Sequence, residues 1–138
     1  MVIALNKISG ILEKFVAQEG ILRLFVRVEN AYIHALLLED SKFMESFLNK
    51  PIEVGFKESN LVVSTAIEGV DNAFRAEILG IQSDKLFARL HLKSSFLSSI
   101  YALCPRDFVE KNALKIGDCV YWHILESEVM LFFKAENG

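Results

Sequence analysis

Two diverged copies of one pattern make up most of the chain, and this duplication limits the fold more than any other feature. An offset of 66 positions places residues 6 onward on the stretch from residue 72 to residue 133. The offset grows to 68 near the end of each copy, as expected when insertions are confined to turns. The aligned pairs include Asn6 with Asn72, Ile8 with Phe74, Gly10 with Ala76, Leu12 with Ile78, Leu48 with Leu114, Phe56 with Trp122 and Glu58 with Glu126. One copy is therefore the unit of folding; the alternative is two unrelated runs of short strands.

Each copy shows the same order of predicted elements, which is strand, strand, strand, short helix, strand, strand. Apolar alternation of period two predicts the strands, and Asp40 is suited to cap the first helix, while Pro105 is suited to begin the second. In the first copy the strands are expected at 7–16, 21–28, 32–38, 52–56 and 61–65, the last two as a closing pair; in the second they are expected at 74–81, 86–92, 97–103, 119–125 and 129–133.

This element list is typical of a barrel of the oligonucleotide/oligosaccharide-binding type. The sequence predicts an all-β fold with short helices, built as two tandem five-stranded barrels. The first is expected at residues 1–65 and the second at 72–138, with a polar linker at 66–71. An edge strand from one copy completing the other would explain why the copies occur in tandem.

Composition indicates burial against partners. Hydrophobic residues make up 52% of the 138, eleven are Phe, and the mean hydropathy is +0.32. Modules of about 65 residues cannot hide so much apolar surface alone, so we expect the copies to pack together and the protein to form a homo-oligomer. No apolar run approaches the roughly 18 residues of a membrane helix, which excludes membrane insertion. We expect a cytoplasmic protein.

The charged and metal-binding residue types exclude several classes of function. The net charge of −3 is spread without a basic stripe, which argues against nucleic acid as a partner. His34, His91 and His123 fall on separate strands without metal-ligand spacing. Cys104 and Cys119 show neither metal-ligand nor disulfide spacing, and both thiols fit an inert core role. Cys104 with His123 lacks the third group of a catalytic triad. We therefore expect neither a metal site nor an enzyme.

The second copy resembles a Mop domain of the TOBE class. The resemblance rests on the segments NAFRAEI, LFARL, IYAL, LKIGDCV and EVML, between residues 72 and 131. The first copy opens with Asn6-Lys-Ile-Ser-Gly, similar to the Asn-x-Leu-x-Gly start of that family. The tandem arrangement resembles two-Mop proteins and the ligand-binding half of the molybdate-responsive regulator. The resemblance implies small barrels that bind molybdate or tungstate without a metal ion.

The family holds its oxyanion with three groups of donors, and the resemblance carries them over only in part. Its Ser-Ala-Arg-Asn falls on Ile3-Ala4-Leu5-Asn6 and on residues 69–72, keeping only Asn6 and Asn72. Its Thr, with a Ser three residues on, falls on Leu38 and Ser41, and on Pro105 and Phe108, keeping only Ser41. Its Lys-Ala-Ser/Thr falls on Lys57-Glu58-Ser59, and on residues 125–127, where Ser127 remains. The oxyanion candidates are therefore Lys57, Ser41, Ser59 and Asn6, with Ser127 and Asn72 as weaker equivalents in the second copy.

Each candidate also has a structural interpretation. Lys57 and Ser59 fit an ordinary turn, Ser41 could help Asp40 to cap the helix, and the two Asn residues could fix turns. Lys85, Arg89 and Lys93 are expected to be solvated on the polar side of a strand. The absence of the family's Arg and the presence of the acidic Glu58 are both expected to weaken oxyanion affinity.

The sequence thus predicts a non-catalytic protein that binds molybdate or tungstate for uptake, storage or sensing. A molybdate transporter or regulator is its possible protein partner. The alternative is an oligomeric interaction module that has kept the barrels and lost the oxyanion. A nucleic-acid-binding barrel is the least favoured interpretation.

Overall fold

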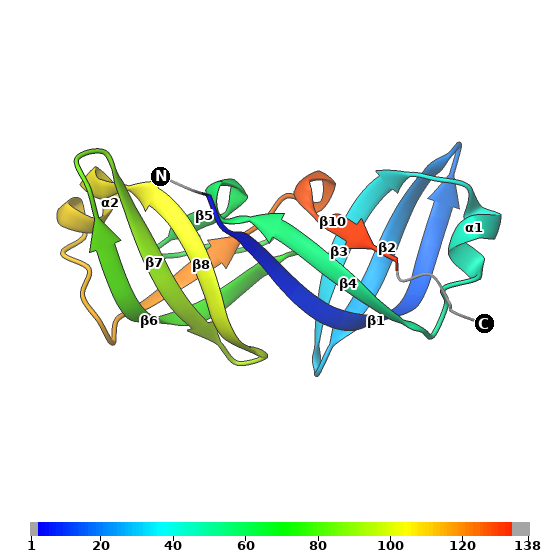
Figure 1. The fold of residues 1–138 in the computed structure, drawn as a ribbon, viewed down its shortest axis with the longest axis horizontal. Coiled ribbons are helices and arrows are strands. Elements are labelled where there is room, and N and C mark those ends of the chain that lie inside the picture. Colours follow the sequence, from blue (N-terminus) through cyan, green and yellow to red (C-terminus); the bar gives the residue numbers. More distant parts are fainter. Residues whose placement is uncertain (1–2, 134–138) are drawn as a thin grey trace. The chain divides into compact units, whose positions relative to one another are not determined.

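The computed structural model describes residues 3–133, and their elements repeat in the order that the duplication predicts (Figure 1). The first copy contains β1 (Leu5–Gln18), β2 (Ile21–Val28), β3 (Ala31–Leu38), helix α1 (Ser41–Glu45), β4 (Pro51–Lys57), the 3-10 helix η1 (Glu58–Asn60) and β5 (Val62–Ser64). The second contains β6 (Ala73–Ser83), β7 (Phe87–Ser94), β8 (Leu97–Pro105), helix α2 (Arg106–Lys111), β9 (Cys119–His123), the 3-10 helix η2 (Glu126–Glu128) and β10 (Met130–Phe132).

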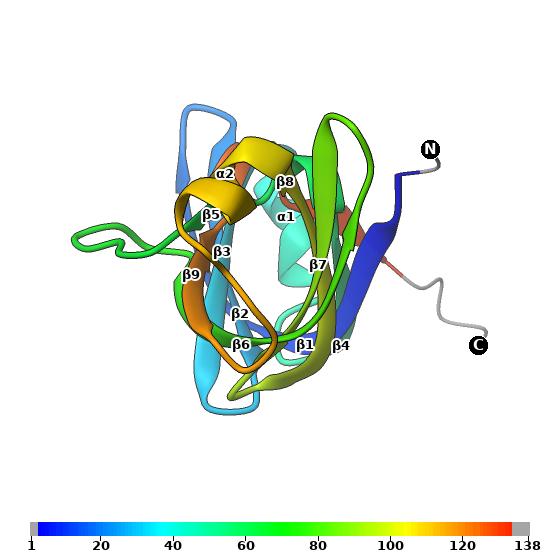
Figure 2. The same ribbon diagram turned by 90° about the vertical axis from the view of Figure 1, so that its left-hand side faces the viewer.

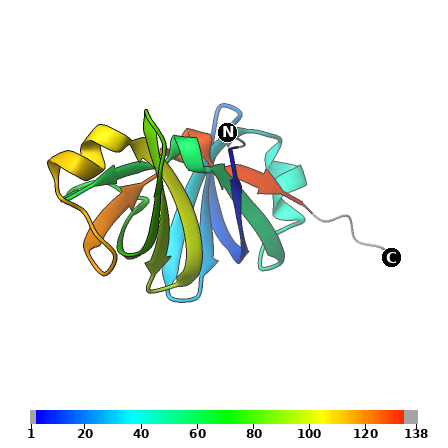
Figure 3. The same cartoon turned by 60° about the vertical axis from the view of Figure 1, so that its left-hand side comes forward.

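The strands form two five-stranded antiparallel sheets with equivalent strand orders, β10-β4-β1-β2-β3 and β5-β9-β6-β7-β8. The predicted fold class was all-β with short helices in two tandem five-stranded barrels, and it is confirmed as a mostly β fold with short helices and two five-stranded antiparallel sheets. In each sheet the outermost strand on one side comes from the other copy. β10 pairs with β4 (Figures 1 and 3), and β5 pairs with β9. The predicted exchange of an edge strand is therefore also confirmed.

Because of this exchange, the two compact units of the chain are not continuous in sequence. One unit contains residues 57–124 with residues 3–6, and we call it the β6–β9 unit; the other contains residues 7–56 and 125–133, and we call it the β1–β4 unit. The predicted limits, 1–65 and 72–138, divide the chain as sequence copies, whereas the units divide it by packing. The two divisions differ at the closing segments, which leave their own copy.

The strand pair predicted to close the first copy illustrates the difference. Strands at 52–56 and 61–65 were expected to lie together, but β5 does not join the sheet of β4. The turn η1 lies between them, and Val63 of β5 is instead opposite Trp122 of β9. Both 3-10 turns escaped prediction because three residues are too few to show a period.

Alternating burial along the strands explains why these segments form sheets. In β2 the side chains of Leu22, Leu24 and Val26 are buried, whereas the residues between them are not. β1 and β6 each contain an irregularity, between Leu12 and Lys14 and between Ile78 and Gly80. These two bulges are again 66 positions apart, which supports the duplication. The largest fully buried side chain is that of Trp122.

The two helices follow their predicted start signals closely. The Asp40 carboxylate accepts a hydrogen bond from the Lys42 amide at 2.9 Å and caps α1. Pro105 was expected to be the first residue of the second helix, but it ends β8 in an extended conformation and precedes α2. The missing N–H of proline is tolerated equally at this position. Figure 2 shows α2 beside the β6–β8 layer, where it packs against β7 and β8.

Gly10 is required by close packing in β1. A Cβ atom at this position would lie 2.7 Å from Val26 Cγ1 and 2.9 Å from the Arg27 carbonyl oxygen. The second copy has Ala76 at the aligned position, opposite the small Ser94. The Ser94 hydroxyl accepts a hydrogen bond from Trp122 Nε1 at 2.8 Å. A small residue therefore occupies this strand position in both copies, Gly10 in the first and Ala76 in the second.

Replacing Gly10 by Ala is expected to lower the unfolding free energy by about 1–3 kcal/mol, the usual effect of overpacking a close contact. Gly80→Ala is the matched control, since a Cβ atom there would lie 3.7 Å from His91 Cβ, an ordinary contact. Urea unfolding of both variants measures the difference. Equal stability of the two variants would contradict this account of the β1 packing.

Candidate functional site

Three predicted site residues lie in the β6–β9 unit near η1. Lys57 and Ser59 flank Glu58, and the side chains of both are exposed. The Glu58 amide donates a hydrogen bond to the Ala4 carbonyl oxygen at 3.0 Å, which brings the start of η1 beside residues 4–6. The structure therefore places Asn6 in the same neighbourhood as Lys57 and Ser59.

The Asn6 side chain holds the edge of β8. Its Nδ2 donates to the Tyr101 carbonyl oxygen at 2.9 Å, and its Oδ1 accepts from the Tyr101 amide at 2.9 Å. Asn6 is 7% exposed, so these two bonds satisfy a buried amide. The aligned Asn72 is also buried and has a φ of 57°, a left-handed conformation that Asn adopts more readily than most residues. Both Asn residues therefore have clear structural roles.

A buried ion pair anchors η1 to β7. The Glu58 side chain has no exposed surface, and Arg89 Nη2 lies 2.7 Å from its Oε1. Arg89 Nε also donates to both carboxylate oxygens, at 3.1 and 3.0 Å. These hydrogen bonds raise the pKa of Arg89. Arg89, predicted to be solvated on the polar side of its strand, instead has its charge balanced by a buried carboxylate.

The β1–β4 unit contains the equivalent pair. Arg23 Nε donates to Glu126 Oε1 at 2.8 Å, and Nη2 donates to Oε2 at 3.1 Å. The exposed fractions of the Arg23 and Glu126 side chains, 34% and 22%, exceed the 24% and 0% of Arg89 and Glu58. Each ion pair joins the second strand of one copy to the turn before the exchanged strand of the other. The Arg89–Glu58 pair therefore holds the turn before β5, and the Arg23–Glu126 pair holds the turn before β10.

The remaining candidates lie in the β1–β4 unit. Ser41 is the first residue of α1 and is partly buried, and Ser127 is an exposed residue of η2. The α1 cap is provided by Asp40. The six candidate residues are thus divided between the two units: Asn6, Lys57, Ser59 and Asn72 in one, and Ser41 and Ser127 in the other.

The structure also bears on the other chemistries that the sequence raised. Within residues 3–133 no cluster of three or more His, Cys, Asp or Glu side chains is arranged to hold a metal ion. Burial raises the pKa of Cys104 to about 11, so its thiol is protonated near neutral pH and a poor nucleophile. Cys119, expected to be buried, is exposed because it begins β9 on the outward side.

No helix in the described part of the chain is both long and apolar enough to cross a membrane.

Sequence reasoning missed the partners of these candidates. Arg89 contacts Glu58, and Tyr101 contacts Asn6. Neither Arg89 nor Tyr101 is among the predicted site residues. A signal was present, because Arg23 and Arg89 are identical residues at the 66-residue offset, just as Glu58 and Glu126 are identical at 68. An Arg and a Glu that recur at equivalent positions of both copies indicate that the two residues form an ion pair in each unit.

The fold described by these two sheets, with short helices after the third strand of each copy, is the tandem Mop fold. It matches the crystal structure of the cytoplasmic molybdate-binding protein ModG, in the form with molybdate bound, with a TM-score of 0.82 and 15% sequence identity. The match covers 91% of this chain and 94% of that chain. The resemblance to tandem Mop proteins is therefore confirmed at the level of the fold. No family model matches the sequence, and a search of curated proteins found no match.

Proposed function

We propose that the protein binds a tetrahedral oxyanion, molybdate or tungstate, without catalysing a reaction. The observation that carries this proposal is the fold match to a molybdate-binding protein over nearly the whole length of both chains. The proposed role is uptake, storage or sensing in the cytoplasm. A homo-oligomer is the proposed assembly, with a molybdate transporter or regulator as a possible protein partner.

The setting of Lys57 and Ser59 supports the proposal. Both side chains are exposed at the start of η1, where an ammonium group and a hydroxyl can donate hydrogen bonds to an oxyanion. Glu58 lies between them, and from sequence it was expected to weaken anion binding. Its carboxylate is buried and paired with Arg89, so the pair adds no net charge to this surface. The expected repulsion is therefore much reduced.

Replacing Lys57 by Ala is expected to weaken molybdate binding by roughly tenfold to a hundredfold, since a hydrogen bond to a charged group is worth about 1.5–3 kcal/mol. Isothermal titration with molybdate, tungstate and sulfate measures this effect. Sulfate carries the same charge, so its exclusion must come from the size of the site. Lys93→Ala, which removes an exposed lysine from β7 of the same unit, is the control and should bind as the unaltered protein does.

A second candidate function is favoured by the exposed apolar side chains of the β1–β4 unit. Ile21 and Leu38 are opposite each other on β2 and β3, with exposed fractions of 49% and 79%. β3 is the outermost strand of its sheet, and an apolar edge of this kind is suited to protein association. No heat with any oxyanion, together with a mass above that of the monomer, would favour this interaction module over the oxyanion binder.

A further inference from the structure

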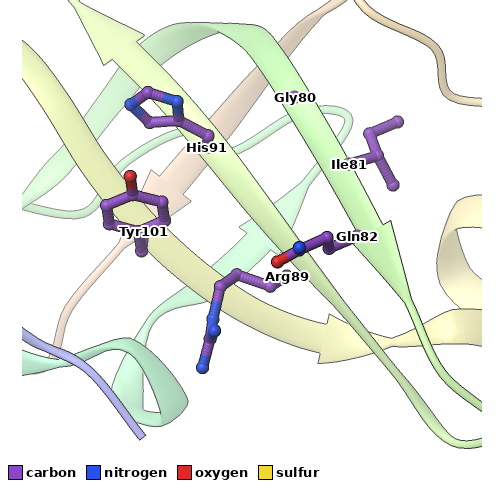
Figure 4. A pocket seen from close by; sticks show the side chains of 6 residues that line it. All are labelled: Gly80, Ile81, Gln82, Arg89, His91 and Tyr101. Carbon is purple, nitrogen blue, oxygen red and sulfur yellow. The ribbon is translucent and has the colours of Figure 1, made fainter.

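A cavity of about 270 Å³ lies on the outer face of β6, β7 and β8, within the β6–β9 unit. Figure 4 shows the side chains around it: Gly80, Ile81, Gln82, Arg89, His91 and Tyr101. None of these residues corresponds to the oxyanion donors considered above. The cavity is open to solvent on one side, and its size suits a ligand of one or two fused rings.

The first copy closes the equivalent place with its own side chain. Lys14 aligns with Gly80, and Phe25 aligns with His91, at the 66-residue offset. In the β1–β4 unit the Lys14 ammonium lies 4.9 Å from the centre of the Phe25 ring. Gly80 has no side chain that could cover His91 in this way. The face of the second copy beside His91 therefore lacks the long side chain that lies over Phe25 in the first copy.

Flat rings form one part of the cavity wall. His91 and Tyr101 are opposite each other on β7 and β8, and their rings stack with centroids 4.6 Å apart and an angle of 11° between planes. His91 Nε2 lies 2.8 Å from the Ser99 hydroxyl, which fixes the ring. Each ring covers one face of the other, so a planar ligand can stack on the face of His91 that Tyr101 does not cover.

The polar groups of the cavity favour a neutral ligand. The charge of Arg89 is already balanced by the buried Glu58, so a dianion would bring an uncompensated charge. The Gln82 side chain is exposed and lines the cavity. Its N–H and C=O groups can pair with a donor and an acceptor side by side, as glutamine does with the edge of adenine.

We propose that this cavity binds a neutral planar heterocycle of the nucleobase type, stacked on the face of His91 that Tyr101 does not cover and paired with the Gln82 amide. This site is separate from the proposed oxyanion function and does not depend on it. Adenosine is the probe, because its base presents an amino donor beside a ring-nitrogen acceptor.

The test is a titration of the ¹⁵N-labelled full chain with adenosine, followed by amide chemical shifts. Saturable shifts are expected at Gly80–Gln82, His91 and Tyr101. Ribose should cause none, and N6,N6-dimethyladenosine, which lacks the amino donors, should bind more weakly. Gly80→Lys imitates Lys14 and should weaken adenosine binding at least about tenfold, the scale of one lost stacking contact.

Two further variants keep the test decisive. Gln82→Ala changes an exposed side chain and should also weaken binding, even if Gly80→Lys proves to disturb the fold. Val16→Ala, at the position of the β1–β4 unit that aligns with Gln82, should leave binding unchanged. The absence of saturable shifts at millimolar adenosine would overturn the proposal. Equal shifts with ribose, or full binding by a folded Gly80→Lys variant or by Gln82→Ala, would overturn it as well.

Discussion

A fragment that ends at residue 65 is expected to have no folded monomeric form. It retains β1 to β5 but lacks β10, which completes the sheet beside β4, and it lacks Glu126, the partner of Arg23. Val129, which precedes β10, is buried in the complete chain. A module of about 65 residues has only a few kcal/mol of stability to lose. The fragment should therefore be unfolded, or should dimerise by exchanging β5 between two copies.

Circular dichroism together with light scattering after gel filtration would measure this result. Addition of a second fragment, residues 66–138, should restore folded structure as a complex with one copy of each, because each fragment carries the strand that the other needs. The intact chain with a cleavable site placed in the linker is the matched control. A folded monomer of the first fragment would show that β10 is dispensable, contrary to the sheet order described above.

Replacing Arg89 by Met is expected to lower the unfolding free energy by about 3 kcal/mol or more, the usual effect of leaving a buried charge without its partner. The remaining Glu58 carboxylate has no exposed surface, so water cannot replace the guanidinium. Glu58→Gln should be less harmful, because the Arg89 side chain is 24% exposed and can be partly hydrated. Urea unfolding measures both changes.

The equivalent pair in the other unit provides the control. Glu126→Gln should lower the unfolding free energy by about 1 kcal/mol or less, since Glu126 and Arg23 are both partly exposed and solvent screens their interaction. The double variant Arg89→Met with Glu58→Met should recover most of the stability, because an apolar pair replaces the buried charges. A double variant as unstable as Arg89→Met alone would contradict this explanation.

The strands were predictable because their information is local. Alternation in 21–28 and the Asp40 capping signal each depend on a few neighbouring residues and agree with the structure. The partner of β5 was not predictable in the same way. Nothing in residues 61–65 distinguishes pairing with β4 from pairing with β9, and only the tandem repeat suggested an exchange.

The site was less predictable than the fold because it depends on contacts between distant segments. The position of Lys57 near residues 4–6 depends on the Ala4–Glu58 hydrogen bond, and the role of Asn6 depends on its bonds to the edge of β8. Neither contact has a local signal in the sequence. Arg89 lies on the polar side of an alternating strand, a pattern that normally indicates solvent. Its buried partner is 31 residues away in sequence.

The exchanged strands also have a consequence for biosynthesis. As the chain leaves the ribosome, β1 to β4 emerge well before β10, which completes their sheet. During translation of the entire second copy, the side of β4 that later pairs with β10 remains open, and open strands of this kind are prone to associate with other chains. The β1–β4 unit is therefore expected to finish folding only after β10 has been made, and nascent chains that still lack β10 are expected to be prone to association.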